Sequence, residues 1–290
     1  MKISAKFLLS LQFGMLTASN KELDILFEDY FDWKRKSYPE WSYDKYQDLL
    51  EDYSDEGVKE KKEDCKRFLE RSQKLKWDTT EYEIYLLVLQ SELKPCVRNH
   101  NWGKYFAPIT HTDGVQTRIP DLIYSTFIES KQDFDNVMAR LGGIPTMIEQ
   151  IIYQLNEGIK GNITHAKEAL KGIDKQFQRI NYEDFIEPFL TAKKFGDVQN
   201  AKKIINTKVI PAFEKLHKYV NNTYSKFLRP EPGLLSNNHG KQIYQEILYY
   251  YLGTNITAEE IHKIGLDEVK HITRQAKSII RKLGYNMNVQ

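Results

Sequence analysis

The residues in this sequence that come closest to a metal site are two Glu-x-x-His pairs near its C-terminal end. Glu259 precedes His262 by three residues, and Glu268 precedes His271 by the same spacing. Di-iron helical bundles use such pairs, but they take them from separate helices. Here the pairs are nine residues apart on one expected helix, and steps of about 100° place them on opposite faces. One metal ion cannot reach both, so each is expected to be an ordinary exposed hydrogen-bonded or ion pair.

No complete catalytic motif accompanies these pairs. The seven histidines form neither HExxH nor HxxEH, the spacings with which common zinc peptidases place their ligands and base. GxGxxG, Walker and GxSxG motifs are also absent from the sequence. Cys65 and Cys96 are not spaced as CxxC, and two thiols alone cannot form a zinc site. They are expected either to form one disulfide in an oxidising compartment or to remain two unpaired core cysteines.

The composition is that of an ordinary globular protein. Of the 290 residues, 41% are hydrophobic and 28% are charged, which suits one large helical domain or two small ones. The 42 basic and 40 acidic side chains leave a formal charge of +2 and are interspersed along the chain. Without a basic face or tail, nucleic acid is not an expected partner. No run approaches the roughly 20 apolar residues of a transmembrane span.

The first 19 residues resemble a secretory signal peptide. Lys2 and Lys6 precede the mostly apolar run Phe7 to Leu16, and small residues follow as far as Ser19, after which cleavage is expected. The alternative is the first amphipathic helix of a cytoplasmic protein, because two polar residues and a glycine interrupt the apolar run. We therefore predict a secreted or secretory-pathway protein and keep a cytoplasmic location as the alternative.

Three Asn-x-Thr sequons bear on the same question. They begin at Asn162, Asn221 and Asn255, and they are compatible with N-glycosylation in a eukaryotic secretory route. Such triplets also arise by chance, so they support the secreted localisation only slightly.

Helical periodicity dominates the chain after the N-terminal segment and predicts an all-α fold. We expect an irregular array of roughly ten helices in a single large domain over residues 20–290. The predicted helices cover 22–36, 58–76, 78–95, 133–141, 145–156, 164–180, a short helix after 181, 197–227, 241–253 and 257–283. Thr164 is expected to cap the helix that follows it, and Thr257 and Glu260 are spaced as a capping box for the last helix. Gly142 and Gly143 are expected to end one helix before Pro145 opens the next, and Pro211 is expected to kink or split another. The segment from Val97 to Ile119 shows no period and is a candidate contact surface.

Four collinear stretches resemble the family known as domain of unknown function 885. They are Glu28 to Tyr43, the aromatic loop Asn101 to Thr117, Arg118 to Thr164, and Leu234 to Ile272. The last is the most specific, because a glycine before a tyrosine-bearing helix is followed by Thr-Ala-Glu-Glu-Ile-His and Gly-Leu-Asp-Glu-Val. Together they cover most of the chain after the signal-like segment, although no single motif carries the resemblance.

The resemblance implies an N-terminal half of a gluzincin-like helical fold. Members of the family are similar to zinc metallopeptidases whose ligands lie in a later half of the domain, so zinc is expected for complete members and no cofactor for this chain. The chain is accordingly expected to be a fragment or a natural short form that is inactive alone. Its expected partners are a peptide substrate or the missing C-terminal half. The alternative function is a secreted, non-catalytic helical binding protein.

The resemblance also indicates where a substrate channel would run. In such folds the N-terminal half supplies one wall of a deep channel, and the candidate channel-facing residues are Trp102, Tyr105, His239, Tyr244 and Tyr251. A purely structural role in packing is the alternative for each of them. An apolar surface left by a missing half also predicts self-association.

Overall fold

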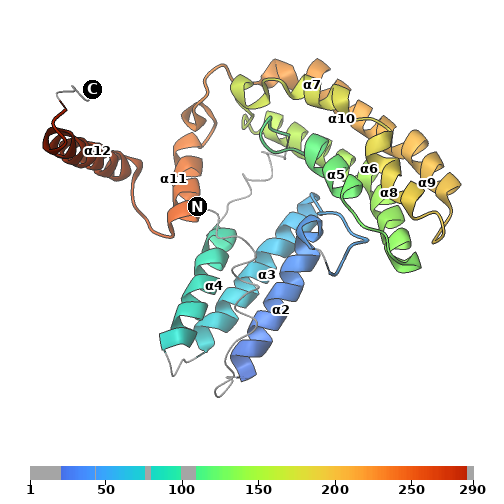
Figure 1. The fold of residues 1–290 in the computed structure, drawn as a ribbon, viewed down its shortest axis with the longest axis horizontal. Coiled ribbons are helices and arrows are strands. Elements are labelled where there is room, and N and C mark those ends of the chain that lie inside the picture. The colour runs from blue at the N-terminus through green and yellow to red at the C-terminus, as the bar shows by residue number, and fades with distance from the viewer. Residues whose placement is uncertain (1–20, 43, 76–79, 99–108, 286–290) are drawn as a thin grey trace.

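The chain forms a single all-α domain in the computed structural model, which describes residues 21–42, 44–75, 80–98 and 109–285. Figure 1 shows a bundle of three long helices, a larger curved helical body and a C-terminal helix that extends away from both. In the described ranges, β pairing is limited to two isolated bridges, Ile109 with Gly114 and Ala166 with Arg229. The predicted all-α class is confirmed. The signal-like segment 1–19 lies outside the described residues.

The three-helix bundle consists of α2 (Lys21–Ser37), α3 (Asp55–Lys74) and α4 (Thr80–Arg98). The short 3-10 turn η1 (Pro39–Trp41) follows α2. The bundle has its own apolar core, in which Leu26, Phe68 and Leu93 are at most 3% exposed. Ser54 begins α3 by accepting a hydrogen bond from the Gly57 amide. Because the apolar residues of each helix follow its 3.6-residue period, the three helices bury one stripe each against the others.

The body is built around α6 (Lys131–Lys160), which packs against α9 (Val198–Ile204) and α10 (Ile210–Asn222). The remaining helices of the body are α5 (Val115–Tyr124), α7 (Ile173–Arg179) and α8 (Glu183–Thr191), with the 3-10 turns η3 (Lys167–Leu170) and η5 (Tyr224–Phe227). The π-turn η4 (Ile205–Val209) joins α9 to α10. Pro211 lies in the first turn of α10, directly after this π-turn. Proline has no N–H to donate in a regular α-helical turn, and the π-turn accommodates this while the helical stretch continues.

The predicted break at Gly142 and Gly143 is wrong. Helix α6 runs without interruption through both glycines and through Pro145. Leu141, Ile144 and Ile148 are fully buried on one continuous stripe. Ile151 and Leu155 of the same helix are also fully buried. Burial of each of these five side chains stabilises by about 1.5–3 kcal/mol, and the sum exceeds the local cost of about 1 kcal/mol per glycine and about 3 kcal/mol for a proline.

Other predicted boundaries also need correction. Helix α4 continues past Pro95 to Arg98, and α5 begins at Val115, so the irregular segment is shorter than predicted. Thr164 caps no helix, because its side chain is bonded to the Phe227 carbonyl. The expected helix 164–180 is instead η3 followed by α7, separated by Gly172, whose φ of 85° is left-handed.

The C-terminal pair is α11 (Gly240–Leu252) and α12 (Ala258–Lys282), which follow the turn η6 (Leu234–Ser236). Thr257 and Glu260 form the predicted capping box at the start of α12. Gly240 opens α11 where a Cβ would lie 2.1 Å from the Leu234 carbonyl oxygen, so only glycine fits. In the part of the chain that the structure describes, no helix combines the length and the apolar character needed to cross a membrane.

Candidate functional site

The predicted channel helix α11 is held in place by Arg98, the last residue of α4. The Arg98 guanidinium lies 3.8 Å from the centre of the Tyr249 ring, its Nε is 3.4 Å from a Glu246 carboxylate oxygen, and its Nη1 donates to the Asn255 side-chain oxygen at 2.8 Å. A cation above an aromatic face and a planar guanidinium fork suit arginine in particular. Arg98 therefore fixes both the helix α11 and the segment after it against the three-helix bundle.

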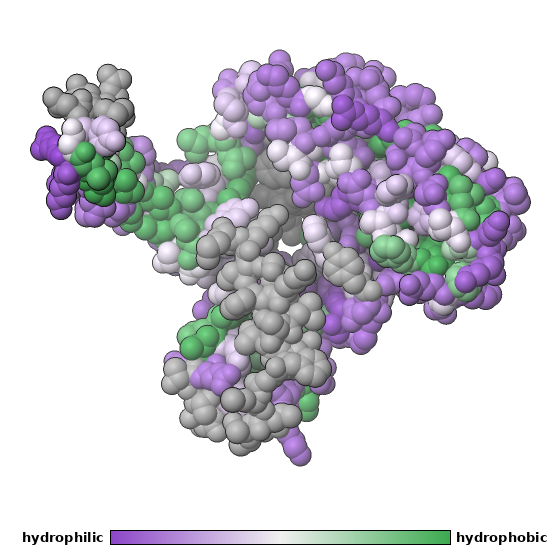
Figure 2. Space-filling view, viewed as in Figure 1, coloured by the Kyte–Doolittle hydropathy of each residue, from purple (hydrophilic) through white to green (hydrophobic). Residues whose placement is uncertain are grey.

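The outer face of α11 is aromatic and exposed. Tyr244 and Tyr251 are two helical turns apart, so they share one face, and they are 41% and 77% exposed. Ile247 lies between them, and Tyr250 packs edge-on against Tyr251 with the ring centres 5.2 Å apart. Figure 2 shows hydrophobic side chains gathered over this part of the molecule. This face suits contact with a peptide or protein, because tyrosine offers apolar area together with a hydroxyl.

The structure brings only part of the predicted channel set together. His239 is exposed and precedes α11 with a left-handed φ of 56°. His239 therefore lies just before the helix that carries Tyr244 and Tyr251, and it is not on the face that these tyrosines share. Trp102 and Tyr105 lie outside the described residues.

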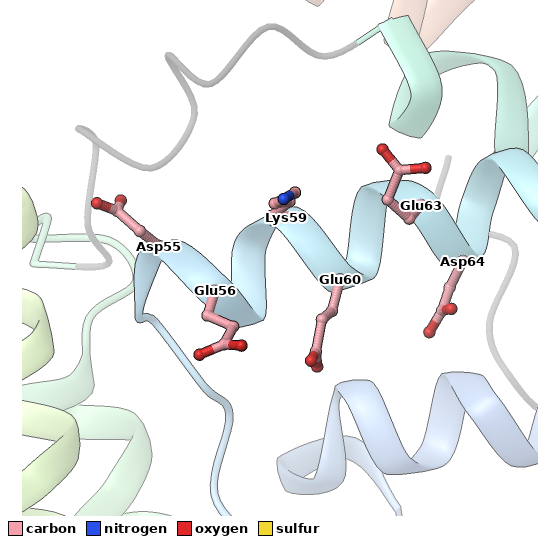
Figure 3. A pocket seen from close by; sticks show the side chains of 6 residues that line it. All are labelled: Asp55, Glu56, Lys59, Glu60, Glu63 and Asp64. Atoms are coloured by element: carbon pink, nitrogen blue, oxygen red, sulfur yellow. The ribbon is translucent and has the colours of Figure 1, made fainter.

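An acidic groove runs along α3, where the sequence predicted only a helix. The groove has a volume of about 650 Å³ and is lined by Asp55, Glu56, Lys59, Glu60, Glu63 and Asp64. Figure 3 shows Glu56, Glu60 and Asp64 on one side of the helix and Asp55, Lys59 and Glu63 on the other. A second, mostly apolar hollow adjoins it near Glu149 and Tyr153 of α6. Such a lining suits cationic side chains rather than anions.

The acidic residues do not assemble a metal centre. Within the ranges that the structure describes, no group of three or more His, Cys, Asp or Glu side chains is placed to hold a metal ion. The two Glu-x-x-His pairs of α12 lie on one unbroken helix, as predicted, and so face opposite ways. Zinc of the metallopeptidase kind therefore does not fit the described residues of this chain.

A buried ion network connects the bundle to the body, and the sequence analysis missed it. The Glu40 carboxylate is 2.9 Å from Arg118 Nε, and the two side chains are 1% and 17% exposed. Arg118 also donates to the Tyr53 hydroxyl at 2.9 Å, which in turn donates to Glu51. Lys61 completes the network by forming an ion pair with Glu51 at 2.8 Å. Glu40 and Arg118 both fall in stretches that carry the family resemblance. Their place in these stretches is the only feature of the sequence that could have pointed to the pair.

Burial sets the protonation behaviour of this network. It raises the pKa of Glu40 although the neighbouring Arg118 acts in the opposite direction. It also holds the pKa of Tyr53 well above its ordinary value, with the negative charge of Glu51 adding to the effect. Desolvation penalises the charged form of each acid, so the network is costly unless every partner is present. Its geometry is that of a structural joint, with no group open to a substrate.

A second buried cluster anchors the segment that leads to α11. His165 is 4% exposed, and its Nδ1 is 2.8 Å from the Tyr224 hydroxyl. Arg229 donates to the Thr164 carbonyl at 2.8 Å and also bonds Ser236 in η6. Burial, followed by the positive charge of Arg229, lowers the pKa of His165 to about 4. His165 is therefore neutral at pH 7, buried beside the Tyr224 hydroxyl.

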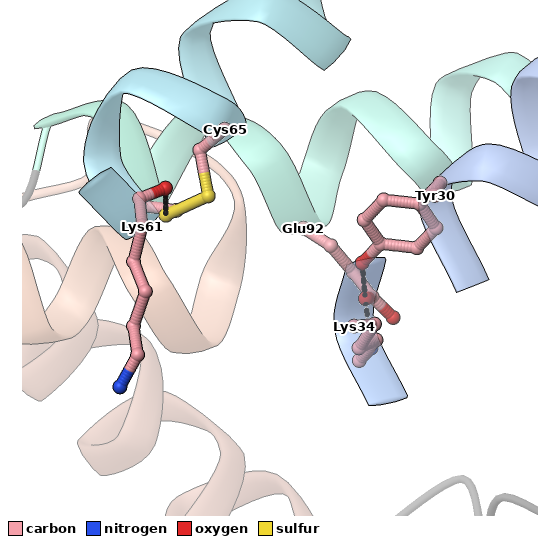
Figure 4. Close-up of a disulfide and its surroundings, with 6 residues drawn as sticks. Tyr30, Lys34, Lys61, Cys65 and Glu92 are labelled. Carbon is pink, nitrogen blue, oxygen red and sulfur yellow. Dashed lines mark hydrogen bonds and ion pairs between the residues drawn. A yellow bond between two sulfur atoms is a disulfide. The ribbon is translucent and has the colours of Figure 1, made fainter. Parts of the chain in front are cut away.

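The two cysteines are joined. Cys65 of α3 and Cys96 of α4 form a disulfide, which settles the alternative that the sequence left open. Figure 4 shows it beside a second link between helices, in which Glu92 accepts hydrogen bonds from Tyr30 and Lys34. The disulfide therefore links α3 to α4, and the hydrogen bonds of Glu92 link α4 to α2.

The sequon asparagines occupy different surroundings. All three are exposed. Asn221 donates to Asp174 at 2.8 Å, Asn255 accepts from Arg98, and Asn162 has a left-handed φ of 55°. Glycosylation of these residues stays a prediction.

The aromatic helix, the glycine that opens it and the capping box after it lie in the stretch that carried the most specific resemblance. A family model described as "Bacterial protein of unknown function (DUF885)" matches residues 39–290. The chain belongs to this family. No curated protein matches the DUF885 chain.

The fold of the DUF885 chain has a counterpart among solved structures. It is similar to the crystal structure of the "putative lipoprotein" from Colwellia psychrerythraea, with a TM-score of 0.68 and 17% sequence identity. The match covers 93% of this chain and 52% of that one. The DUF885 chain therefore spans about half the length of the solved structure, and the likeness shows a shared fold.

Proposed function

We propose that this DUF885 chain is the N-terminal, non-catalytic half of a larger helical hydrolase of the zinc metallopeptidase-like kind, and that it is inactive alone. The observation that carries the proposal is the coverage: nearly the whole chain matches a solved structure of which it accounts for only 52%. The family resemblance supplies the class of reaction. Zinc does not fit the described residues, so the proposal assigns no catalytic step to them.

In this proposal the chain contributes a wall that contacts peptide. The exposed face of α11 offers Tyr244 and Tyr251 to apolar side chains. The groove along α3 offers carboxylates to lysine or arginine side chains of the same substrate. Both surfaces are built on helices, which hold such residues more rigidly than loops do. A peptide with basic and apolar residues is the substrate class that this wall fits.

The test compares the 290-residue chain with a chain extended along its own coding sequence. The proposal expects an in-frame HExxH-type motif beyond residue 290, zinc and peptide cleavage in the extended protein, and neither in the short one. Stoichiometric zinc in the short chain, with peptide cleavage that a chelator abolishes, would contradict the inactive assignment. A stop codon directly after Gln290 would contradict the larger hydrolase.

The second candidate is a secreted, non-catalytic binding protein, which the exposed tyrosines of α11 favour. It predicts that the short chain is the complete natural product and that it retains peptides on its own. Binding of a basic, tyrosine-rich peptide library by the short chain, lost on Tyr251→Ser but kept on Tyr124→Ser, distinguishes it. Tyr124 is a matched control because it is 60% exposed on α5.

For localisation we propose the secretory route or the cell envelope. The Cys65–Cys96 disulfide supports this, since structural disulfides persist in oxidising compartments. The similar structure from Colwellia psychrerythraea, a "putative lipoprotein", agrees with it. N-terminal sequencing of the natural protein checks the proposal: a mature chain beginning at Asn20 is expected, and a chain that keeps residues 1–19 contradicts it.

A further inference from the structure

Helix α12 is the one large element of the described chain with no buried residue. Figure 1 shows that it leaves the rest of the molecule at its N-terminal end and extends outward. Yet it carries bulky apolar side chains: Val269, Ile272 and Ile279 are 62%, 59% and 57% exposed, and Leu283 is 65% exposed. Figure 2 shows part of this apolar surface. A contiguous apolar face of this length on a solvent-exposed helix marks an interaction site.

The apolar positions are spaced for pairing with another helix. From Ile261 they recur at Gly265, Val269, Ile272, Ala276, Ile279 and Leu283, in steps of three or four residues. Such spacing keeps one narrow stripe on one side and is the pattern of left-handed helix pairs. The stripe covers 22 residue steps, or about 33 Å of helix.

The stripe is close to symmetric about Ile272. If two copies of α12 lie antiparallel with Ile272 opposite Ile272, then Ile261 meets Leu283 and Gly265 meets Ile279, while Val269 and Ala276 lie one position out of register with each other. A small residue thus faces a large one in the Gly265–Ile279 layer, as well-packed helix interfaces require. No contact within 4 Å is found for a Cβ placed on Gly265 among the described residues, so none of these residues requires glycine there.

The charges of α12 complement each other in the same orientation. The first half, up to Val269, carries four acidic residues and one lysine, and the second half carries five basic residues and no acidic one. Antiparallel pairing places each acidic half beside a basic half, whereas parallel pairing would place like charges together. The helix dipole explains the charges of the end turns only, and Asp267, Glu268, Lys270 and Arg274 lie in the middle.

We infer that α12 pairs antiparallel with α12 of a second copy of this chain, centred on Ile272. The contact is two-fold symmetric, so the same stripe serves both partners and the assembly closes as a dimer. Because α12 is connected to α11 at its N-terminal end, the remaining parts of the two copies lie at opposite ends of the helix pair. The inference is made for the 290-residue chain and uses neither zinc nor catalysis. A C-terminal half of the kind proposed above would compete for the same stripe, so the dimer is tested on the 290-residue chain itself.

Mass measurement by light scattering tests the dimer. The wild-type chain is expected at twice its monomer mass of 34.2 kDa. Ile272→Asp is expected to convert it to monomer, because two carboxylates would meet at the symmetry axis; the side chain is exposed in the monomer, so the fold is preserved. Ser278→Asp, which adds the same charge at an exposed position away from the stripe, is the matched control and is expected to remain dimeric. A monomeric wild type, or a dimeric Ile272→Asp chain, overturns the inference.

Cysteine cross-linking tests the orientation. The native cysteines already form a disulfide, so an introduced cysteine is the only free thiol among the described residues. A mixture of Ile261→Cys and Leu283→Cys chains is expected to cross-link, while each variant alone is not. Cross-linking of Ile261→Cys with itself indicates a parallel pair and overturns the antiparallel register.

The Gly265→Leu variant distinguishes a specific pair of α12 helices from unspecific association through an apolar surface. The added side chain enlarges the apolar face, so binding to a lipid surface or to unspecific partners would become stronger. In the antiparallel pair it collides with Ile279 of the second copy, and overpacking weakens such layers. Weaker dimerisation supports the inference. Stronger association, or a monomer that binds lipid vesicles, overturns it.

Discussion

At the scale of single residues, the buried groups of this protein make folding stability depend on pH. His165 has its pKa lowered from 6.5 to about 4 by burial and by Arg229. Between these values the unfolded chain binds a proton that the folded chain rejects. The free energy of unfolding therefore falls as pH decreases through this window, by about 3 kcal/mol in total, and this loss is complete below the folded pKa. Above pH 6.5 the group is neutral in both states and has no further effect.

Urea unfolding across this pH range checks the prediction. The His165→Gln chain is expected to be less stable than wild type at pH 7 but to lack the loss attributed to His165, so the two stabilities converge toward pH 4. His262→Gln, on exposed α12, is the control and should keep the wild-type profile. Equal pH dependence of wild type and His165→Gln would show that the imidazole does not govern the effect.

The Glu40–Arg118 pair makes a second prediction with its own dependence on pH. Arg118→Met leaves the Glu40 carboxylate, 1% exposed, without its cation, at a cost of about 3–5 kcal/mol at pH 7. The pKa of Glu40 is already raised above its ordinary 4.5 by burial, and it rises further in the variant. A raised folded pKa gives stability below 4.5 that is lost as pH increases, so the cost of the substitution is smaller near pH 4.5 than at pH 7.

Paired unfolding curves at the two pH values measure this difference. Lys131→Met removes an ion pair between side chains 74% and 51% exposed, and its expected effect is below about 0.5 kcal/mol at either pH. If Arg118→Met cost as little as Lys131→Met, the network would not be the joint between bundle and body.

At the scale of elements, α6 shows how packing overrides local signals. Gly142 is exposed within the helix, and a Cβ there would meet nothing within 4 Å. Gly142→Ala is therefore expected to raise the free energy of unfolding by about 0.5–1 kcal/mol, because alanine loses less backbone entropy. Gly143→Ala is the comparison, since its Cβ would touch Leu50 at 3.4 Å. Thermal melts of both variants check this, and destabilisation by Gly142→Ala would indicate a functional bend.

The sequence predicts those elements whose signals are local. Thr257 and Glu260 are three residues apart, and their capping box was read directly from that spacing. The break expected at Gly142 failed because the deciding contacts come from α9 and α10, more than fifty residues away. For the same reason Glu40 and Arg118 were not recognised as a pair: no periodicity relates positions 78 residues apart. Tyr244 and Tyr251 were named from the family resemblance, and their seven-residue spacing then places them on one face of α11.

At the scale of the whole molecule, two apolar cores are joined by polar contacts. The bundle core and the body core consist of separate sets of buried residues. Between them, Arg140 of α6 donates to the backbone carbonyls of Pro39 at 2.9 Å and Leu49 at 3.1 Å, and the Glu40–Arg118 pair adds to this joint. Helix α12 contributes to neither core, so its stability is separable from that of the rest.

This separation makes a prediction about a chain shortened to end at Thr257. The shortened chain keeps Asn255, which accepts from Arg98, and the Ile256 carbonyl, which accepts from Gln245. Its body is expected to melt at the temperature of the full chain, because the removed helix buries no side chain. Its mass is expected to be that of a monomer, because the α12 stripe is gone. A chain ending at Gly284 keeps the stripe through Leu283 and serves as the control, with dimer mass expected.

Circular dichroism and light scattering on the same samples make this decisive. The shortened chain should lose the helical signal of one 25-residue helix while its main transition is preserved. In the dissociated Ile272→Asp chain, α12 amides should exchange with solvent much faster than those of α6, because an isolated helix without tertiary packing is marginal in water. A lower melting temperature of the body after shortening would mean that α12 packs on its own chain. Retention of the dimer would place the interface elsewhere.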